Sequence, residues 1–568
     1  MVFNARGIWK TLGRKKSVDQ SFESPLRRCL VFVDLFLLGV GGSVDVALYI
    51  VLGNVIRDLS GPSVLISMVL TFFVCLGSGL CYAEFASYIP TSGSDYDYVY
   101  SSLGEMCAFF DGWSILVASI LATAVLAQGA GDLLSSLTNS ASFEYLDSHV
   151  ELPEHSLLAS NLNVMATLIV ILVTIISAIG VQGSIRFNCI IVVINIMVVI
   201  FTFILGLFYI DFDNWSSWDK FAPYGANGIL DALPVCLFFY GGYVSVTFSS
   251  EEVINPYQIL PKSIVASLVG IFVLFMMIAF VLGLAIPYDQ LPKMSPLSDA
   301  FGNVAFKESK YIIAVGGFCS CFSSVLTASY GNSRLAYVIS RDGLITRFLS
   351  KVNKRTQVPI NAVLTTGLIA GVLAAFFDLT ILVEMCSILA VMPYILLLFS
   401  VILSRYKEIL PHEEPKEDES SVDAIDTIDD GSVSLSPSSV ETETKIKPKI
   451  IVALVMLVLS TTALSLLVRF SVSYDVDKAV FGILAAVFLI PLMVSFVVIY
   501  KTPYEKLVFP FTMPCFPLLP TTCLVMYVFI MLQFSMWAWI VFCCNFVLGK
   551  FKVHLIPQRP CYMVQFFT

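Results

Sequence analysis

Charged residues are scarce in this sequence, and their scarcity excludes several classes of protein. Only 13% of the 568 residues are charged, about half the share in an average soluble domain, whereas 57% are hydrophobic. A water-soluble core cannot hide so many apolar side chains, but a lipid bilayer can. The net charge of −9 leaves no basic face for neutralising phosphates, so we expect no nucleic-acid partner.

Histidine and recognisable catalytic motifs are also scarce. The four histidines are scattered and form no HExxH pattern. The sequence contains no P-loop, no Rossmann fingerprint and no visible nucleophile–base pair. We therefore expect neither an enzyme nor a protein that holds a metal or another cofactor.

Fourteen cysteines are present, which at first suggests a disulfide framework. All of them fall in apolar stretches or in segments that we predict to be cytoplasmic. We therefore interpret them as buried small hydrophobic residues rather than as disulfides or metal ligands.

Long apolar runs are the dominant feature of the sequence. A bilayer core of ~30 Å needs about 20 apolar residues per helix, and lipid cannot hydrogen-bond an exposed backbone. The sequence therefore predicts an all-α polytopic membrane protein of about fourteen transmembrane helices. Their windows are 30–56, 63–83, 107–128, 164–181, 188–210, 229–249, 264–286, 310–333, 359–377, 380–403, 450–468, 479–500, 517–533 and 537–556.

The distribution of Lys and Arg predicts the orientation of these helices. Residues 1–28 are basic and polar and precede an apolar stretch directly, which indicates a cytoplasmic tail rather than a cleavable signal peptide. With that tail inside, 26 of the 33 basic residues fall on the cytoplasmic side and 7 outside. The one N-x-Ser/Thr sequon, at Asn214, then lies outside, where glycosylation occurs.

An acidic, serine-rich segment divides the apolar windows into two groups. Residues 404–449 contain few large apolar side chains, so we expect a disordered cytoplasmic linker. Phosphorylation of its serines is an alternative role, but a solvated tether is the simpler interpretation. The linker separates a ten-helix core, 29–403, from four C-terminal helices, 450–556, and a cytoplasmic tail follows at 557–568.

The first and sixth windows are interrupted by glycine. Residues 39–45 read GVGGSVD, and residues 239–243 read FYGGY a few positions after Pro234. Each glycine weakens a helix by roughly 1 kcal/mol relative to alanine. Close helix packing at small residues explains one such run. A matched pair, five windows apart, favours two broken helices that expose backbone groups to a substrate.

Asp45 stands out as an acidic residue in the middle of the first window. An unpaired carboxylate at this depth costs several kcal/mol, so it should face the bundle interior or a cavity. It could bind a substrate amine, coordinate a cation, take up a proton, or act as a structural ligand near a helix end. We interpret Asp34 and Asp111, which lie near predicted cytoplasmic helix ends, as interfacial caps.

An ordered set of motifs resembles the cationic amino acid transporter family of the amino acid–polyamine–organocation superfamily. The resemblance runs from about residue 24 to residue 405 and again, weakly, from 509 to 550. The motifs include LRRCL at 26–30, CYAEF at 81–85, GW at 112–113, EEV at 251–253, NP at 255–256, SPL at 295–297, DGL at 342–344 and FPLLP at 516–520.

The resemblance implies two inverted five-helix repeats plus four C-terminal helices, and alternating access to a central site. It implies transport of cationic amino acids or related amines across the plasma membrane, with both termini cytoplasmic. Tyr240 and Tyr243 would shape or gate the pocket. The implied substrate-binding residues are Gly41, Gly42, Ser43, Asp45, Tyr240, Gly241, Gly242, Tyr243 and Ser245.

Two departures from the family pattern affect the implied site. The run in the first window has Asp45 and Ala47 where the family has glycines, and an aspartate there would repel an α-carboxylate. In the sixth window Tyr243-Val244 replaces Phe-Asp. A non-transporting sensor or binding scaffold is therefore the alternative function. The sequence has no external cysteine before the fourth window, so we expect no disulfide-linked heavy chain.

Overall fold

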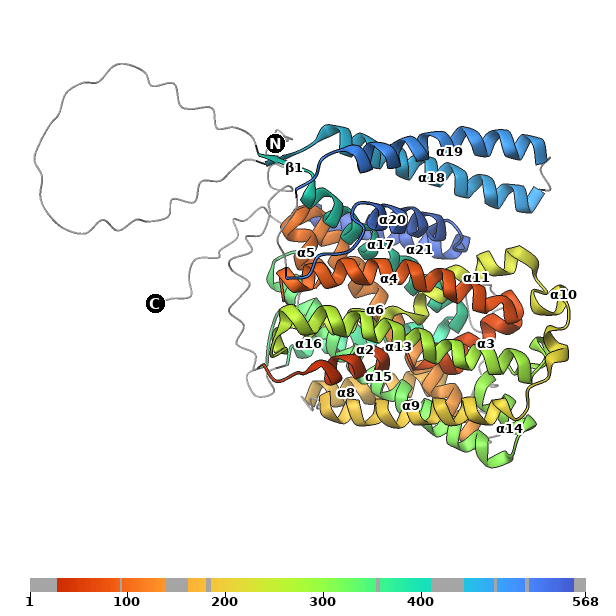
Figure 1. Cartoon of the computed structure of the whole chain (residues 1–568). Helices are drawn as coiled ribbons and strands as arrows, with labels where there is room; N and C mark the ends of the chain where they lie inside the picture. Colours follow the sequence, from red (N-terminus) through yellow and green to blue (C-terminus); the bar gives the residue numbers. More distant parts are fainter. Residues whose placement is uncertain are drawn as a thin grey trace, which may run out of the picture.

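The structure is a computed structural model, and it is built almost entirely from helices. Figure 1 shows most of them running along a common direction. The only strands in the described part of the chain are β1 (Lys407–Ile409) and β2 (Thr444–Ile446), which pair antiparallel. The described residues are 28–91, 94–138, 162–179, 185–353, 358–409, 444–474, 478–505 and 510–555.

The first half of the chain forms short helices at the two glycine runs and long helices elsewhere. The α-helices are α2 (Phe32–Gly41), α3 (Leu52–Val55), α4 (Val64–Tyr88), α5 (Asp95–Ser102), α6 (Glu105–Thr138), α8 (Val164–Ile179), α9 (Ile185–Leu207), α10 (Trp218–Phe221), α11 (Gly225–Phe239), α12 (Val244–Phe248) and α13 (Pro256–Ala285). The π-helical turns are Ala47–Val51 and Ile56–Ser60. The 3₁₀ turns are Gly61–Ser63, Phe212–Trp215, Gly241–Tyr243, Ser250–Glu252 and Tyr288–Gln290.

The second half consists of longer, mostly uninterrupted helices. They are α14 (Pro296–Val304), α15 (Lys307–Arg341), α16 (Ile360–Phe376), α17 (Leu379–Arg405), α18 (Pro448–Tyr474), α19 (Lys478–Lys501), α20 (Leu518–Met531) and α21 (Met536–Leu555).

Nine spans in the described residues are long and apolar enough to cross a membrane, and a tenth is possible if α20 and α21, bent by 111°, act as one. The chain is therefore a multi-pass membrane protein. Helices occupy all fourteen predicted windows, but α2, α8 and α16 are shorter than a full span. The count of fourteen crossings and the inverted repeat stay predictions.

The core of the molecule lies around α6, α15 and α17. α6 packs against α15 and α17, and α4 packs against α13 and α11. In contrast, α18 and α19 lie together at one side of the bundle (Figure 1), and Ile483 on α19 is 67% exposed. Exposed aliphatic side chains on a spanning helix are suited to lipid. The candidate broken helices thus sit inside the bundle, away from its lipid-facing edge.

The predicted segments at the ends and middle of the chain are described only in part. Residues 1–27, 410–443 and 556–568 lie outside the described residues. The two ends of the predicted linker, however, form the β1–β2 pair, with Lys407 opposite Ile446. The final residue of α17, Arg405, forms a buried ion pair with Glu84 of α4 at 2.5 Å. The β1–β2 pair thus joins the end of the core to the start of the C-terminal helices, whereas the Arg405–Glu84 pair joins two helices of the core.

Candidate functional site

The first predicted break lies where α2 ends. Gly41 is the last residue of α2, and a π-helical turn begins at Ala47; residues 42–45 between them leave regular helical structure. Three N–H groups in the break, those of Gly42, Ser43 and Val44, donate to carbonyls of the preceding turn of α2. The glycine-rich run therefore ends one helix and begins another within the same apolar window.

The second break is shorter and tighter. α11 ends at Phe239, and a 3₁₀ turn over Gly241–Tyr243 leads into α12. Pro234 lies inside α11 and removes one backbone donor from its last turns. The α-helix of the sixth window is thus interrupted only briefly at its glycines, and Trp218–Phe248 still forms one span.

The two breaks are in direct contact. The Ser43 hydroxyl accepts a hydrogen bond from the N–H of Gly242 at 2.9 Å. A Cβ added to Gly242 would lie 2.3 Å from the carbonyl oxygen of Gly39, and one added to Gly42 would lie 3.1 Å from the Cα of Gly242. Only glycine at position 242 permits this approach of the two backbones.

Exposed backbone lies beside this contact. Gly42 is exposed although its neighbours Gly41 and Ser43 are buried, and Gly241 and Ser245 are half-buried. A Cβ added to Gly241 would meet no atom within 4 Å. We call this region, bounded by Gly42, Gly241 and Ser245, the break opening.

Asp45 is buried at the first break, with 4% of its surface exposed. Its Oδ1 accepts a hydrogen bond from the N–H of Ala47 at 3.2 Å, and the Ser324 hydroxyl is a further partner. Its side chain therefore faces the bundle interior and not lipid, as the desolvation cost of a carboxylate requires.

A polar network behind the first break escaped the sequence analysis. Asn195 of α9 donates to the carbonyl of Val44 at 2.6 Å and to the Ser320 hydroxyl at 2.8 Å. Ser320 also donates to Val44, and Tyr49 donates to the Asn195 amide oxygen. The signal in the sequence was Asn195 itself, a polar residue in the middle of an apolar window, which in a membrane usually marks a functional position.

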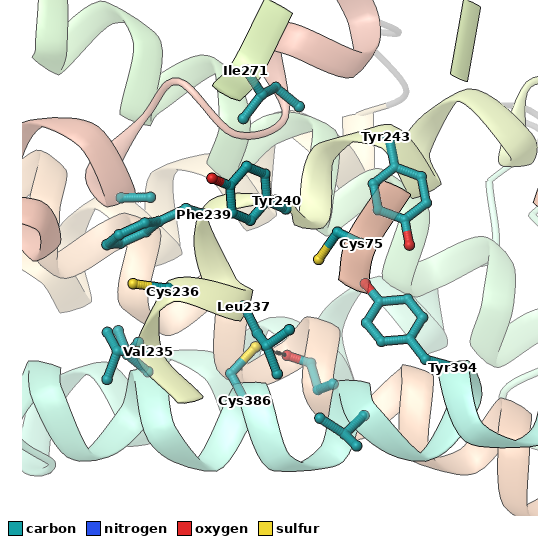
Figure 2. Close-up of a cluster of buried hydrophobic side chains, with 14 of the residues drawn as sticks. Cys75, Val235, Cys236, Leu237, Phe239, Tyr240, Tyr243, Ile271, Cys386 and Tyr394 are labelled. Atoms are coloured by element: carbon teal, nitrogen blue, oxygen red, sulfur yellow. Dashed lines mark hydrogen bonds between the residues drawn. The ribbon is translucent and has the colours of Figure 1, made fainter. Parts of the chain in front are cut away.

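The two predicted tyrosines are both fully buried but point in different directions (Figure 2). The Tyr240 hydroxyl donates to the carbonyl of Met68 at 2.9 Å. The Tyr243 hydroxyl is hydrogen-bonded to Ser78 at 3.0 Å. Both partners belong to α4, so each hydroxyl attaches the sixth window to α4.

One face of α15 leads away from Asp45. Ser324, Thr327, Gly331 and Arg334 follow one another at helical spacing, and the last three are exposed. Arg334 lies within electrostatic reach of Glu252, which follows α12. This polar face connects the partner of Asp45 with the end of α15 that we predict to be cytoplasmic.

Of the two predicted interfacial caps, one is a cap and the other is not. Asp34 accepts a hydrogen bond from the N–H of Val31 at 3.1 Å, at the start of α2. Asp111, in contrast, is fully buried inside α6, and neither of its carboxylate oxygens has a hydrogen-bond partner. The interpretation of Asp111 as an interfacial cap is wrong, because α5 packs against this part of α6.

The predicted glycosylation site lies between α9 and α10. Asn214 is half-buried, and its side-chain amide donates to the carbonyl of Leu284 at 2.8 Å. Attachment of a glycan to this nitrogen would have to break that hydrogen bond.

The cysteines in the described part of the chain are all free thiols. Most are buried or half-buried, but the expectation that all are buried is wrong for five. A thiol is apolar enough to face lipid, which explains exposed cysteines on spanning helices. The exposed ones are Cys29, Cys319, Cys515, Cys543 and Cys544.

Comparison with known proteins agrees with the helical architecture. The sequence profile of the amino acid permease family matches residues 30–416, which include both breaks and the polar network. Cationic amino acid transporter 4 of Mus musculus is 32% identical over 406 residues, or 71% of this chain and 64% of that protein. The chain thus spans slightly under two thirds of that relative's length.

Two further relatives come from other kingdoms of life. The methylthioribose transporter of Bacillus subtilis is 32% identical over 401 residues, covering 70% of this chain and 86% of that protein. The vacuolar cationic amino acid transporter 4 of Arabidopsis thaliana is 31% identical over 408 residues, covering 70% and 67%. The chain therefore belongs to the amino acid permease family, as a divergent member of its cationic amino acid transporter group.

Proposed function

We propose that the protein is an amino acid transporter that carries cationic amino acids or related amines by alternating access. The observation that carries the proposal is the break opening, which lies where two interrupted helices meet, together with the buried carboxylate of Asp45 at the same break. The names of the relatives, which include cationic amino acid transporters, support the same class of substrate.

The charges around the break opening favour an amine over a carboxylate. α2 and α11 end at the two breaks, and the helical turns that follow begin there, at Ala47 and Gly241, so helix-end charges of both signs meet at the opening and largely offset each other. Asp45 adds a full negative charge. The amides of residues 42–44 already donate to α2 carbonyls, which leaves fewer donors for an anion. A positively charged side chain or amine is the complementary ligand.

The polar face of α15 provides a route between this site and one side of the membrane. Thr327 and Gly331 are exposed on it, and a Cβ added to Gly331 would meet no atom within 4 Å. Arg334 and Glu252 lie at its far end. Movement of α15 relative to α12 would then open or close the route, as expected when one helix bundle rocks against the other.

The proposed arrangement in the membrane is fourteen crossings in two inverted five-helix repeats and four further helices, in the plasma membrane. Both termini would be cytoplasmic and Asn214 external, and no disulfide-linked heavy chain is required. Treatment of the cell-surface protein with an N-glycosidase should increase its electrophoretic mobility, and Asn214→Gln should abolish that shift. A protein that reaches the surface without this modification would contradict the glycosylation proposal.

The function is tested by uptake into proteoliposomes that contain the purified protein. Radiolabelled L-arginine, L-lysine, L-leucine and spermidine form the panel, and empty liposomes provide the background. We expect saturable uptake of at least one cationic compound and much weaker uptake of L-leucine. If a folded, correctly inserted protein transports none of the four, the proposal fails.

The double substitution Asp45→Gly, Ala47→Gly tests the role of charge in selectivity. It removes the carboxylate and restores the glycines that the family has at these positions. We expect uptake of L-leucine to rise relative to that of L-arginine, because both share the α-carboxylate but only L-arginine loses an attraction between its cationic side chain and Asp45. An unchanged ratio would show that Asp45 does not act on the substrate.

A non-transporting sensor is the second candidate function, and Asp45 is the observation that favours it. An acidic residue among the amides departs from the pattern of the family, while the scaffold motifs persist. A sensor would bind the panel compounds without moving them. Saturable binding to detergent-solubilised protein, combined with no uptake, would favour this function over transport.

A further inference from the structure

The C-terminal helix α20 reaches the second break through a serine of α4. The Ser78 hydroxyl lies 2.8 Å from the hydroxyl of Tyr527, on α20, and 3.0 Å from that of Tyr243, at the end of the 3₁₀ turn. Tyr527 and Tyr243 are fully buried, and so is Ser78. Tyr527, on one of the four C-terminal helices, is thus linked through the Ser78 hydroxyl to the turn that borders the break opening.

The Ser78 hydroxyl has a limited hydrogen-bonding capacity. A serine hydroxyl has one hydrogen to donate and two lone pairs that accept. The Ser78 oxygen lies 3.0 Å from the carbonyl of Cys75, and with its one hydrogen directed there it can accept from both tyrosines. The other acceptor near Tyr527, the Cys75 sulfur, is 4.0 Å away and weaker. The Cys75 carbonyl and the two tyrosine hydroxyls therefore share one Ser78 hydroxyl, and loss of either tyrosine hydroxyl changes how the remaining groups hydrogen-bond to it.

Aromatic contacts hold the same residues together. The ring of Tyr394, on α17, lies 5.3 Å from that of Tyr527 and 6.4 Å from that of Tyr243. Figure 2 shows the hydroxyls of Tyr243 and Tyr394 pointing toward each other beside Cys75. The ring packing and the hydroxyl contact with Ser78 together set the position of Tyr243.

α20 is also anchored independently of Tyr527. A Cβ added to Gly77 would lie 2.1 Å from the sulfur of Cys523, which shows how closely α20 approaches α4. In the segment before α20, the N–H of Met513 donates to Glu84, the ion-pair partner of Arg405, at 2.8 Å. α20 therefore stays docked when a single hydroxyl is removed.

We propose that Tyr527 is a positioning residue for the substrate site: through Ser78 it holds Tyr243, and with it the 3₁₀ turn that borders the break opening. A shift of Tyr243 would also reach the first break, because the N–H of Gly242, next to Tyr243, donates to the hydroxyl of Ser43. The C-terminal helices then help to set the geometry of the substrate site. The inference rests on the proposed function only in treating the break opening as the binding site.

The test measures access to the break opening without any substrate. Gly241→Cys places a thiol in open space, and its rate of modification by N-ethylmaleimide is followed by mass spectrometry of the peptide that contains residue 241. The rate is compared in backgrounds carrying Tyr527→Phe, Ser78→Ala, or both. Ser245→Cys provides a second reporter if Gly241→Cys is poorly folded.

Tyr406→Phe is the matched control. Tyr406 is fully buried between the core and the C-terminal helices, and its hydroxyl donates to the carbonyl of Ile499 at 2.6 Å. This variant loses one buried tyrosine hydrogen bond near the same helices but has no hydroxyl contact with Ser78. It therefore separates the proposed positioning from a general loss of stability.

We expect Tyr527→Phe and Ser78→Ala each to change the modification rate about threefold or more, the size of effect expected from one buried hydrogen bond. We expect the double variant to equal Ser78→Ala, because Tyr527 acts through Ser78, and Tyr406→Phe to leave the rate unchanged. An unchanged rate in Tyr527→Phe, additive effects in the double variant, or an equal effect of Tyr406→Phe would each overturn the proposal. The readout needs no uptake, so a failure of the transport proposal would be seen separately.

Discussion

The two breaks have similar glycine content but different surroundings. The first, at residues 42–45, carries Asp45 and is hydrogen-bonded by the amide of Asn195 and the hydroxyls of Ser320 and Ser324. The second, at residues 240–243, carries no charge and is held by two tyrosine hydroxyls bonded to α4. The charged and polar groups are therefore concentrated at one break and the aromatic groups at the other.

This difference suggests a division of roles. A charged side chain inside a membrane needs polar partners, and Asp45 has them in the N–H of Ala47 and the hydroxyl of Ser324 on α15. Tyrosine rings supply rigid packing together with one polar contact, which is suited to positioning the second break. We infer that the first break selects the substrate by charge and that the second sets the shape of the site.

The largest expected effect comes from the contact between the breaks. Gly242→Ala would place a Cβ 2.3 Å from the Gly39 carbonyl, whereas Gly241→Ala would meet nothing within 4 Å. We expect the first variant to lose folded protein, since overpacking against the backbone costs about 1–3 kcal/mol or more. We expect the second to keep its melting temperature but to show reduced uptake. Equal melting temperatures for both would show that the breaks can separate at no cost.

The next largest effect is expected from the charge at the first break. Asp45→Asn keeps the size of the side chain and removes its charge. We expect L-arginine uptake to fall by about 10- to 100-fold, since a hydrogen bond to a charged group contributes ~1.5–3 kcal/mol. Asp34→Asn, at the start of α2, is the control and should change uptake little. The division of roles is wrong if both variants behave alike.

A smaller effect is expected behind the first break. Asn195→Ala removes a donor to Val44 and leaves the Tyr49 hydroxyl without its acceptor. We expect a loss of stability of ~1–3 kcal/mol, seen as a lower melting temperature. Ser320→Ala should cost less, because Asn195 still donates to Val44. A larger loss in Ser320→Ala than in Asn195→Ala would contradict this description of the network.

The smallest effect is expected from Tyr240. Tyr240→Phe removes only the hydrogen bond to the Met68 carbonyl, which contributes about 1 kcal/mol, and keeps the ring. We expect a slightly lower melting temperature and an unchanged KM for L-arginine. A changed KM would show that the Tyr240 hydroxyl reaches the substrate, as the sequence analysis expected for a gating residue.

The apolar windows and the glycine runs were predictable from the sequence for simple physical reasons. Lipid imposes a minimum length of apolar helix, and GVGGSVD and FYGGY weaken a helix whatever surrounds them. The contact partners were not predictable in the same way. The Ser43–Gly242 bond joins residues 199 positions apart, and nothing in either local pattern indicates the partner.

Burial of single residues was also difficult to predict. Asp34 and Asp111 both precede apolar stretches, yet only Asp34 caps a helix, because α5 covers Asp111. The roles of Asn195, Ser78 and Tyr527 depend on three-dimensional neighbours from distant windows. Periodicity and composition describe each helix separately, so they do not show which helices bring such groups together.

The central claim is that a positively charged substrate binds at the break opening beside Asp45. Its most direct test is protection of Gly241→Cys from N-ethylmaleimide by L-arginine, L-lysine or spermidine, measured with and without Asp45→Asn. The account predicts that at least one of these compounds slows modification in a saturable way and that Asp45→Asn abolishes the protection. Modification at the same rate in the presence of every compound, or equal protection after loss of the carboxylate, would contradict it.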